Sequence, residues 1–295
     1  MKKKIFSLEF PFFLGIPALI WQFLFFYAPL LILVITSFIK ISEEGFIQGF
    51  TFEKIYFFLN PIYGKVIVAS LLLAFSNAVI CLLIAYPVAY FMAIAAKKFK
   101  NLLLILMIVP FWTNFLLHVY AWFFVLERDG FLNTLLRSIG IINEPIQLLN
   151  SLFSIMVMMV YYYLPFMVLP LYSSLERFDY KLIEASLDLG ATSMQTFRRI
   201  MLPLTLGGVR TGFFLVYIPS FGEFAIPELM GGDKQMFVGS VVSHYILGEE
   251  TGSLGAAFTV VSCFSLLVSA IFFFWLISRF LKRNPKAPKI LSKAL

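Results

Sequence analysis

Five long uncharged runs constrain the fold of this chain more than any other feature of its sequence. Each holds 26 to 31 consecutive residues without Asp, Glu, Lys or Arg, and the runs are 10–39, 66–96, 101–126, 145–175 and 251–278. A helix needs about 20 apolar residues to cross about 30 Å of hydrocarbon, so each run is long enough to span a membrane. A sixth run, 200–222, contains one charge, Arg210, whose long side chain can reach back to the headgroups.

We therefore predict an all-α membrane protein with six transmembrane helices. The predicted spans are about 12–38, 66–96, 101–126, 147–175, 204–222 and 253–278. Strands of a membrane barrel are disfavoured, because the runs lack alternation and are far longer than the roughly 9 to 11 residues that such a strand needs.

The composition excludes a soluble protein and disfavours an enzyme. Of 295 residues, 61% are apolar and 13% charged, and the mean hydropathy is +0.92, whereas soluble domains carry about 25% charged residues. The longest segments between spans, about 176–199 and 223–250, hold fewer than 30 residues each and leave no room for a soluble catalytic domain. The phosphate-binding pattern G-x-x-x-x-G-K-S/T does not occur in the sequence. We expect no catalytic residues and no cofactor in this chain.

The cysteines and histidines do not indicate a metal site. Cys81 and Cys263 fall inside predicted spans, where a cysteine is most simply a small apolar packing residue. His118 and His244 have no further ligand-type residues at metal-binding spacing. We expect His118 and Asn77, both within spans, to form hydrogen bonds to other helices.

The distribution of basic residues predicts the orientation in the membrane. Placing both termini in the cytoplasm assigns 17 of the 23 Lys and Arg to that side, in the clusters 2–4, 97–100, 177–210 and 279–293. Because cytoplasmic loops are enriched in Lys and Arg, this topology is favoured over its inverse. The basic tail 282–295 is suited to anionic headgroups rather than to nucleic acid.

Acidic residues are distributed the other way. Eleven of the 16 Asp and Glu fall outside, which gives net charges of −5 outside and +12 inside. An acidic outer face can concentrate cations or match a partner surface, although ordinary solvated loops would give the same count.

The cytoplasmic loop 176–203 begins with the pattern of a short amphipathic helix. Tyr180, Ile183 and Leu187 recur at helical spacing on one face, and Asp179 stands where it can cap the first turn. An amphipathic helix beneath the membrane needs headgroups or a groove in another protein to receive its apolar face.

A second short helix follows in the same loop. Gly190 is placed to end the first helix in a left-handed conformation. Thr192 and Gln195 have the spacing of a capping box, and we expect this second helix to end before Pro203 begins the next span.

The same loop resembles the EAA signature of ABC-importer permeases. The matching residues are Glu184, Ala185, Ser186, Gly190, Ile200, Leu202 and Pro203. Ser186 departs from the family pattern, which has a second alanine there, but serine is small enough for the same close approach. The resemblance implies the type I ABC-importer permease fold, with 176–203 as the coupling helix that docks into a cytoplasmic ATPase.

Three further segments are similar to the spermidine/putrescine branch of that family, the permeases of the PotB and PotH type. They are 109–114 (VPFWTN), 164–174 (LPFMVLPLYSS) and 222–232 (GEFAIPELMGG). This resemblance implies a polyamine importer in a bacterial inner membrane. It also implies a second related permease, two ATPase subunits that use ATP and Mg, and an extracytoplasmic polyamine-binding protein as partners.

A polyamine route requires carboxylates, aromatic faces and polar groups that replace lost water. The candidate residues are Trp112, Asn114, Tyr120, Tyr161, Tyr162, Glu223 and Glu228. On a continuous third helix, the rings of Trp112, Phe115 and Tyr120 could share one face. Each candidate also has a structural alternative, since aromatic residues in spans usually pack or form interfacial belts, and Glu223 could pair with Lys234.

Two other functions remain open at this stage. An ion-gradient-driven secondary transporter would need a carboxylate in the middle of a span, and no Asp or Glu falls there. An ABC permease for another small solute would share the coupling loop and differ only in the substrate.

Overall fold

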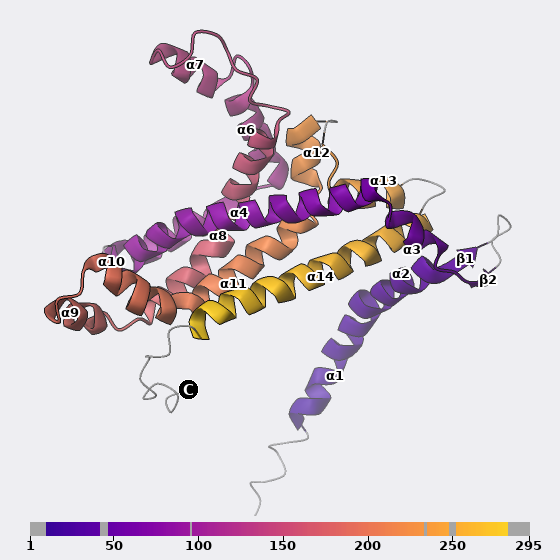
Figure 1. The fold of residues 1–295 in the computed structure, drawn as a ribbon, viewed down its shortest axis with the longest axis horizontal. Helices are drawn as coiled ribbons and strands as arrows, with labels where there is room; N and C mark the ends of the chain where they lie inside the picture. The colour runs from indigo at the N-terminus through magenta and orange to yellow at the C-terminus, as the bar shows by residue number, and fades with distance from the viewer. Residues whose placement is uncertain (1–9, 42–46, 95, 233–234, 248–251, 283–295) are drawn as a thin grey trace, which may run out of the picture. The chain divides into compact units, whose positions relative to one another are not determined.

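The computed structural model describes residues 10–41, 47–94, 96–232, 235–247 and 252–282. The chain divides into two compact units, one formed by 1–65 with 241–264 and the other by 66–240 with 265–295. Most described residues are helical (Figure 1). Residues 2–4 and 283–295, which carry much of the basic charge used in the orientation prediction, lie outside the described residues.

Five helical segments of the described chain are long and apolar enough to cross a membrane. They are Gly15–Phe38, Pro61–Ile94, Leu152–Glu176, Ser193–Phe221 and Gly252–Arg279. A bent pair, Lys100–Trp112 with Phe115–Ser138, brings the number to six if it counts as one span. The predicted all-α membrane fold is confirmed, and its six segments correspond to these five helices and the bent pair.

In the first unit, α1 (Phe10–Gln22) and α2 (Ala28–Phe38) are joined by a π-turn, η1 (Phe23–Tyr27). Pro29 lies in the first turn of α2 and cannot donate a backbone hydrogen bond, which accounts for the widened turn just before it. The side chains of the 24-residue span Gly15–Phe38 are almost all unburied within this chain, as befits a helix surrounded by lipid or by another membrane protein.

A short hairpin and an aromatic cluster complete the first unit. Strands β1 (Ile39–Ile41) and β2 (Ile47–Phe50) pair antiparallel and are followed by α3 (Glu53–Phe58). Phe58 and Phe258 are fully buried with ring centroids 5.0 Å apart, and the hydroxyls of Tyr63 and Tyr245 lie 2.7 Å apart. These residues belong to α3, α4 (Pro61–Ile94), α13 (Val238–Leu247) and α14 (Gly252–Lys282).

The second unit is centred on the crossing of α8 (Leu152–Glu176) and α11 (Leu202–Phe221). Glycines on α11 allow the two backbones to approach closely. A Cβ on Gly208 would lie 2.6 Å from the Ser174 Cβ and 2.7 Å from the Pro170 carbonyl oxygen. A Cβ on Gly212 would lie 2.7 Å from the Met167 sulfur. Small residues at a crossing are the usual device for packing helices in lipid.

Polar side chains tie the neighbouring helices to this centre. Asn77 of α4 donates to the Ser220 hydroxyl of α11 at 2.8 Å, and both residues are buried. The hydroxyls of Tyr217 on α11 and Ser269 on α14 lie 2.8 Å apart. The expectation that Asn77 forms an interhelical hydrogen bond is confirmed.

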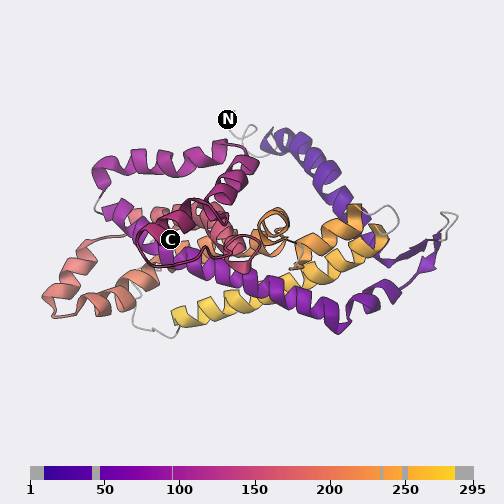
Figure 2. The ribbon, with the colours of Figure 1, turned by 90° about the horizontal axis from the view of Figure 1, so that it is seen from above.

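The third predicted span is not one straight helix, and the prediction of a continuous helix over 101–126 is wrong. After the short turn η2 (Lys97–Phe99), helix α5 (Lys100–Ile108) tightens into the 3₁₀ turn η3 (Val109–Trp112), and α6 (Phe115–Leu126) starts anew. The two halves are bent by 96° (Figure 2). Pro110 and the extended backbone of Thr113 and Asn114 account for the break. Helix α7 (Phe131–Ser138) follows α6.

Residues 176–203 form the predicted helical hairpin. Its helices are α9 (Lys181–Asp188) and α10 (Ser193–Thr196). The second does not end before Pro203 as predicted, because the π-turn η4 (Phe197–Met201) carries it directly into α11. Pro203 cannot donate a backbone hydrogen bond, and the widened π-turn just before it accommodates that loss, so the helix continues. Helix α12 (Ala225–Gly231) follows α11.

Candidate functional site

The two arms of the hairpin are joined by a buried hydrogen bond. The hydroxyls of Ser186 on α9 and Thr196 on α10 lie 2.7 Å apart, and Ser186 is 6% exposed. Ser186 also lies 2.8 Å from the Ile183 carbonyl oxygen, to which it can donate. The position where this chain departs from the family pattern therefore makes a specific contact between the arms.

Backbone conformation fixes the turn between the arms. Gly190 has φ +83°, a left-handed conformation that favours glycine, and its N–H donates to the Leu187 carbonyl. Thr192 and Gln195 form the predicted capping box, with bonds of 3.3 and 3.0 Å. The predicted cap at Thr192 is thereby confirmed. At the start of α9, Tyr180 rather than Asp179 is the N-cap, and the Asp179 carboxylate accepts from the Lys181 N–H at 3.1 Å.

Contacts at the C-terminal end of α8 hold the hairpin. The Tyr180 hydroxyl donates to the Leu175 carbonyl at 2.7 Å. Burial raises the pKa of Tyr180 to about 12, so its hydroxyl stays protonated and remains a donor across the physiological range. Lys100, at the start of α5, forms a 2.8 Å ion pair with Glu176, which also accepts from Tyr172 at 2.9 Å.

The outer face of α9 is not covered by any other part of the chain that the structure describes. Glu184 and Ala185 are exposed, and Leu189 at the tip is 89% exposed. Glu184 borders a cavity of about 550 Å³ whose wall also includes Lys100, Glu176, Asp179 and Lys181. An acidic and apolar surface at the tip of a braced hairpin is suited to docking against another protein.

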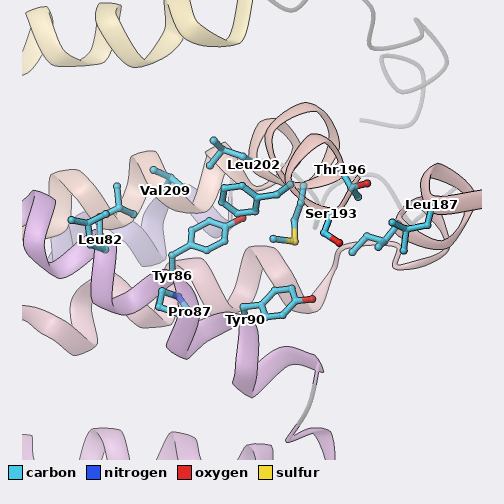
Figure 3. Close-up of a pocket in the computed structure, with 13 residues that line it drawn as sticks. Leu82, Tyr86, Pro87, Tyr90, Leu187, Ser193, Thr196, Leu202 and Val209 are labelled. Atoms are coloured by element: carbon cyan, nitrogen blue, oxygen red, sulfur yellow. The ribbon is translucent and has the colours of Figure 1, made fainter. Parts of the chain in front are cut away.

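The inner face of the hairpin borders an apolar cavity of about 700 Å³ against α4 (Figure 3). Ile183 and Leu187, which were predicted to share one face, both line it from α9. Within this chain, that face is directed toward α4 rather than toward headgroups or another protein. The rings of Tyr86 and Tyr90 project from α4 toward the hairpin (Figure 3), and the Tyr86 hydroxyl lies 2.9 Å from that of Thr205.

The remaining residues of the signature lie where the hairpin enters the span. Leu202, the first residue of α11, lines the cavity just described, and Pro203 follows it. Ile200 is half-buried in the π-turn before them. No observation on the structure tests their predicted role in coupling.

The break in the third span separates residues that were predicted to share one face. Trp112, in η3, is 82% exposed, and Tyr120, in α6, is 66% exposed. Because the 96° bend falls between these two rings, the predicted common helical face does not exist. Asn114 is the N-cap of α6, and its side chain accepts from the Leu116 N–H at 2.8 Å.

His118 braces this break. One ring nitrogen lies 2.5 Å from the Thr113 hydroxyl and 3.0 Å from the Pro110 carbonyl oxygen, and the other lies 2.8 Å from the Tyr161 hydroxyl of α8. The expected interhelical hydrogen bond of His118 is confirmed. Tyr162 packs its ring against those of Phe111 and Phe115, so it and Tyr161 support the broken span from α8.

The side chain of Glu223 is positioned by a hydrogen bond from α8 and by another from the backbone that follows it. Its carboxylate accepts from the Tyr163 hydroxyl at 2.6 Å and from the Ala225 N–H at 3.1 Å. Charge-assisted bonds to a carboxylate are among the stronger hydrogen bonds in proteins. Glu228 is exposed on α12, and Lys234, the alternative partner of Glu223, lies outside the described residues.

Sequence reasoning missed three functional contacts. It selected Tyr161 and Tyr162, whereas Tyr163 reaches Glu223. It did not pair Ser186 with Thr196 or Lys100 with Glu176. Residues in a stretch of three tyrosines point in different directions on a helix, so only the tertiary structure could identify the one that meets the carboxylate. Among the described residues, no three His, Cys, Asp or Glu side chains gather as a metal site would require.

Two solved structures share this architecture. The chain aligns with a bacterial ABC transporter involved in the import of the acidic polysaccharide alginate, with a TM-score of 0.70 and 15% identity, over 92% of this chain and 96% of that one. A bacterial alginate ABC transporter in complex with an alginate pentasaccharide-bound periplasmic protein aligns with a TM-score of 0.64 and 16% identity, over 93% and 96% of the two chains. At this identity the similarity concerns the fold.

Sequence comparison gives closer relatives. The spermidine/putrescine transport system permease protein PotB of Escherichia coli K12 is 39% identical over 269 residues, which cover 90% of this chain and 96% of that protein. PotB of Haemophilus influenzae is 37% identical over 265 residues, covering 90% of this chain and 92% of that protein. The resemblance drawn from the signature of the cytoplasmic loop is thereby confirmed.

The family profile for binding-protein-dependent transport system inner membrane components matches residues 85–283. This range includes the braced hairpin, the α8–α11 crossing and the segment around Glu223. With a permease architecture, an EAA-type loop and relatives that align along nearly the whole chain, the protein belongs to the family of binding-protein-dependent transport system inner membrane components, as an ABC-importer permease of the PotB type.

Proposed function

We propose that this chain is the membrane-spanning permease subunit of an ATP-driven importer of polyamines such as spermidine and putrescine. The observation that carries the proposal is the 39% identity to a spermidine/putrescine permease over 90% of the chain. The chain forms half of the pathway, and a second related permease forms the other half. Two cytoplasmic ATPase subunits supply the ATP and Mg chemistry, and an extracytoplasmic binding protein delivers the solute.

Coupling to the ATPase runs through the hairpin. Its arms are joined at Ser186 and Thr196 and braced at Tyr180, so a force on the exposed tip moves the hairpin as a unit. The direct continuation of α10 through η4 into α11 transmits that motion to a membrane helix. ATP binding then opens the pathway outward, and hydrolysis returns it inward.

The outer part of the pathway uses carboxylate and aromatic groups. A polyamine carries several ammonium charges on an apolar chain, so it requires anionic partners and ring faces. Glu223, oriented by Tyr163, supplies the fixed carboxylate, and Glu228 adds an exposed one. The exposed ring of Trp112 and the polar break at Asn114 supply further contacts in the third span.

The proposed orientation places both termini and the hairpin in the cytoplasm. The positive-inside distribution of Lys and Arg supports it. The acidic outer loops then face the binding protein and the incoming cation.

The decisive experiment measures uptake of labelled putrescine and spermidine in cells with and without this chain. Variants Glu184→Ala and Asp188→Ala are compared, since both carboxylates are exposed on α9 and only Glu184 belongs to the signature. We expect uptake that requires the chain, survives dissipation of the proton gradient, falls at least about ten-fold in Glu184→Ala and persists in Asp188→Ala.

Two results would contradict the proposal at different points. Polyamine uptake that is indifferent to the chain would refute the substrate, and the solute would then be sought through the binding protein that co-purifies with the complex. Uptake that is unchanged in Glu184→Ala would refute the coupling role of that residue.

A further inference from the structure

An apolar groove of about 460 Å³ runs between α4, α11 and α14 in the second unit. Its walls are aliphatic and aromatic, with Phe75 and Leu82 from α4, Leu206 and Phe213 from α11, and Phe273 and Leu276 from α14. The rings of Phe75 and Phe273 stack with centroids 4.9 Å apart and give the groove a firm wall. A surface of this kind accepts a hydrocarbon chain.

One charged residue, Arg198, lines the groove. It lies in the π-turn η4, four residues before the start of α11, and its side chain is exposed. The ion pairs found among the described residues are Lys40 with Glu53 and Lys100 with Glu176, so no described carboxylate neutralises Arg198. An unpaired guanidinium at the end of an apolar groove favours a ligand with an anionic head and an apolar tail.

Independent features place this end of the groove at the level of the lipid headgroups. Trp275, which precedes Leu276 of the groove, is exposed, and the Arg279 guanidinium lies 4.9 Å from the centre of its ring. Tryptophan and arginine at the end of a membrane helix are typical of the interface.

We propose that this groove is a binding site for one anionic phospholipid of the cytoplasmic leaflet. The phosphate of the headgroup pairs with the Arg198 guanidinium, and an acyl chain lies along the groove toward Phe213. Because Arg198 repels cations, the groove is suited to a different ligand from a polyamine. The site therefore does not depend on which solute the transporter carries.

The test uses the complete transporter complex, purified in a mild detergent. The complex is incubated with a mixture of phosphatidylglycerol and phosphatidylcholine, and native mass spectrometry then measures which lipid it retains. Arg198→Gln removes the charge, Arg198→Lys keeps it, and Leu206→Phe fills the groove. Arg199→Gln is the matched control, because this neighbouring arginine does not line the groove.

We expect Arg198→Gln to reduce retained phosphatidylglycerol by about five-fold, as the loss of one interfacial cation implies. Leu206→Phe keeps the charge but occupies the space of the acyl chain, so it should also reduce retention. Arg198→Lys and Arg199→Gln should retain phosphatidylglycerol like the parent. The proposal would be overturned if all variants retained the same amount of phosphatidylglycerol. It would also be overturned if the parent retained as much phosphatidylcholine as phosphatidylglycerol. A disulfide between Leu206→Cys and a cysteine placed in the second permease would also overturn it, because the partner permease rather than a lipid would then occupy the groove.

Discussion

At the scale of single residues, the hairpin 176–203 depends on a buried pair of hydroxyls, those of Ser186 and Thr196. Ser186 is buried, whereas its neighbour Ala185 is exposed, so two adjacent positions of the signature serve different purposes. The buried position joins the arms, and the exposed position remains available to a partner.

Replacing Ser186 by alanine should weaken the hairpin modestly. The change leaves the buried Thr196 hydroxyl without its partner across the hairpin, which costs about 1 kcal/mol. The thermal unfolding temperature of the purified complex should fall, and Ser186→Ala combined with Thr196→Val should recover part of the loss. Ala185→Ser serves as the control and should leave the unfolding temperature unchanged.

The bond between Tyr163 and Glu223 yields a second prediction at this scale. Tyr163→Phe removes a donor to a carboxylate, a contribution of about 1.5–3 kcal/mol. We expect the freed carboxylate to reorient and solute uptake to fall, which a transport assay with increasing solute concentration measures. Tyr162→Phe is the control, because its ring packs against Phe111 and Phe115, and an equal loss there would exclude a specific role for Tyr163.

At the scale of elements, two features determine how the helices pack: the close crossing of α8 and α11, and the left-handed turn at Gly190 between the arms of the hairpin. The α8–α11 crossing has no room for a side chain at Gly208, whereas a Cβ placed on the adjacent Gly207 would have no heavy atom within 4 Å. The two glycines therefore differ in function although they are neighbours in the sequence.

Alanine at these two glycines should act in opposite directions. Gly208→Ala forces a Cβ to within 2.6 Å of Ser174 and should destabilise the protein by about 1–3 kcal/mol. Gly207→Ala meets no neighbour and should be neutral or slightly stabilising, because alanine favours helix by about 1 kcal/mol. Thermal unfolding of the two variants tests this prediction. Equal unfolding temperatures for Gly208→Ala and Gly207→Ala would refute the close approach of α8 and α11 at Gly208.

The turn at Gly190 gives a similar pair of variants. A methyl group there meets no neighbouring atom, so its cost comes from φ +83° alone. Gly190→Ala should cost about 1–2 kcal/mol and reduce the uptake obtained per ATP hydrolysed. Gly190→Asn should restore much of this coupling, since asparagine tolerates the left-handed conformation. If both variants behave alike, the turn does not limit coupling.

At the scale of the whole molecule, the orientation in the membrane determines which partners each surface can meet. The hairpin tip and the loop after α7 belong to opposite sides in the proposed topology. Each side offers a well exposed residue for chemical labelling, Leu189 at 89% and Ile141 at 66%.

A cysteine at each position should react from one side only. In a background without Cys81 and Cys263, Leu189→Cys should be labelled by a membrane-impermeant maleimide in inside-out vesicles, and Ile141→Cys in right-side-out vesicles. The reverse pattern would refute the orientation and, with it, the contact between the hairpin and a cytoplasmic ATPase.

The sequence by itself determined the class of the protein and the local form of the hairpin 176–203. Uncharged runs of 26 to 31 residues can satisfy their backbone in lipid only as helices. The cap at Thr192, the contact of Asp179 with the Lys181 N–H and the turn at Gly190 depend on residues within a few positions of one another. Such local interactions are encoded in spacing, and for that reason they could be predicted.

The tertiary structure alone decided which distant residues meet. The choice of Tyr163 for Glu223, the brace of His118 across the broken third span and the pairing of Lys100 with Glu176 join residues 43 to 76 positions apart. Their contacts depend on how helices rotate and bend against one another, which hydrophobic runs do not encode because every face of such a run is apolar. The 96° bend has the same origin. Pro110 permits a break in the helix, but the packing around His118 and Tyr161 determines the angle between its two halves.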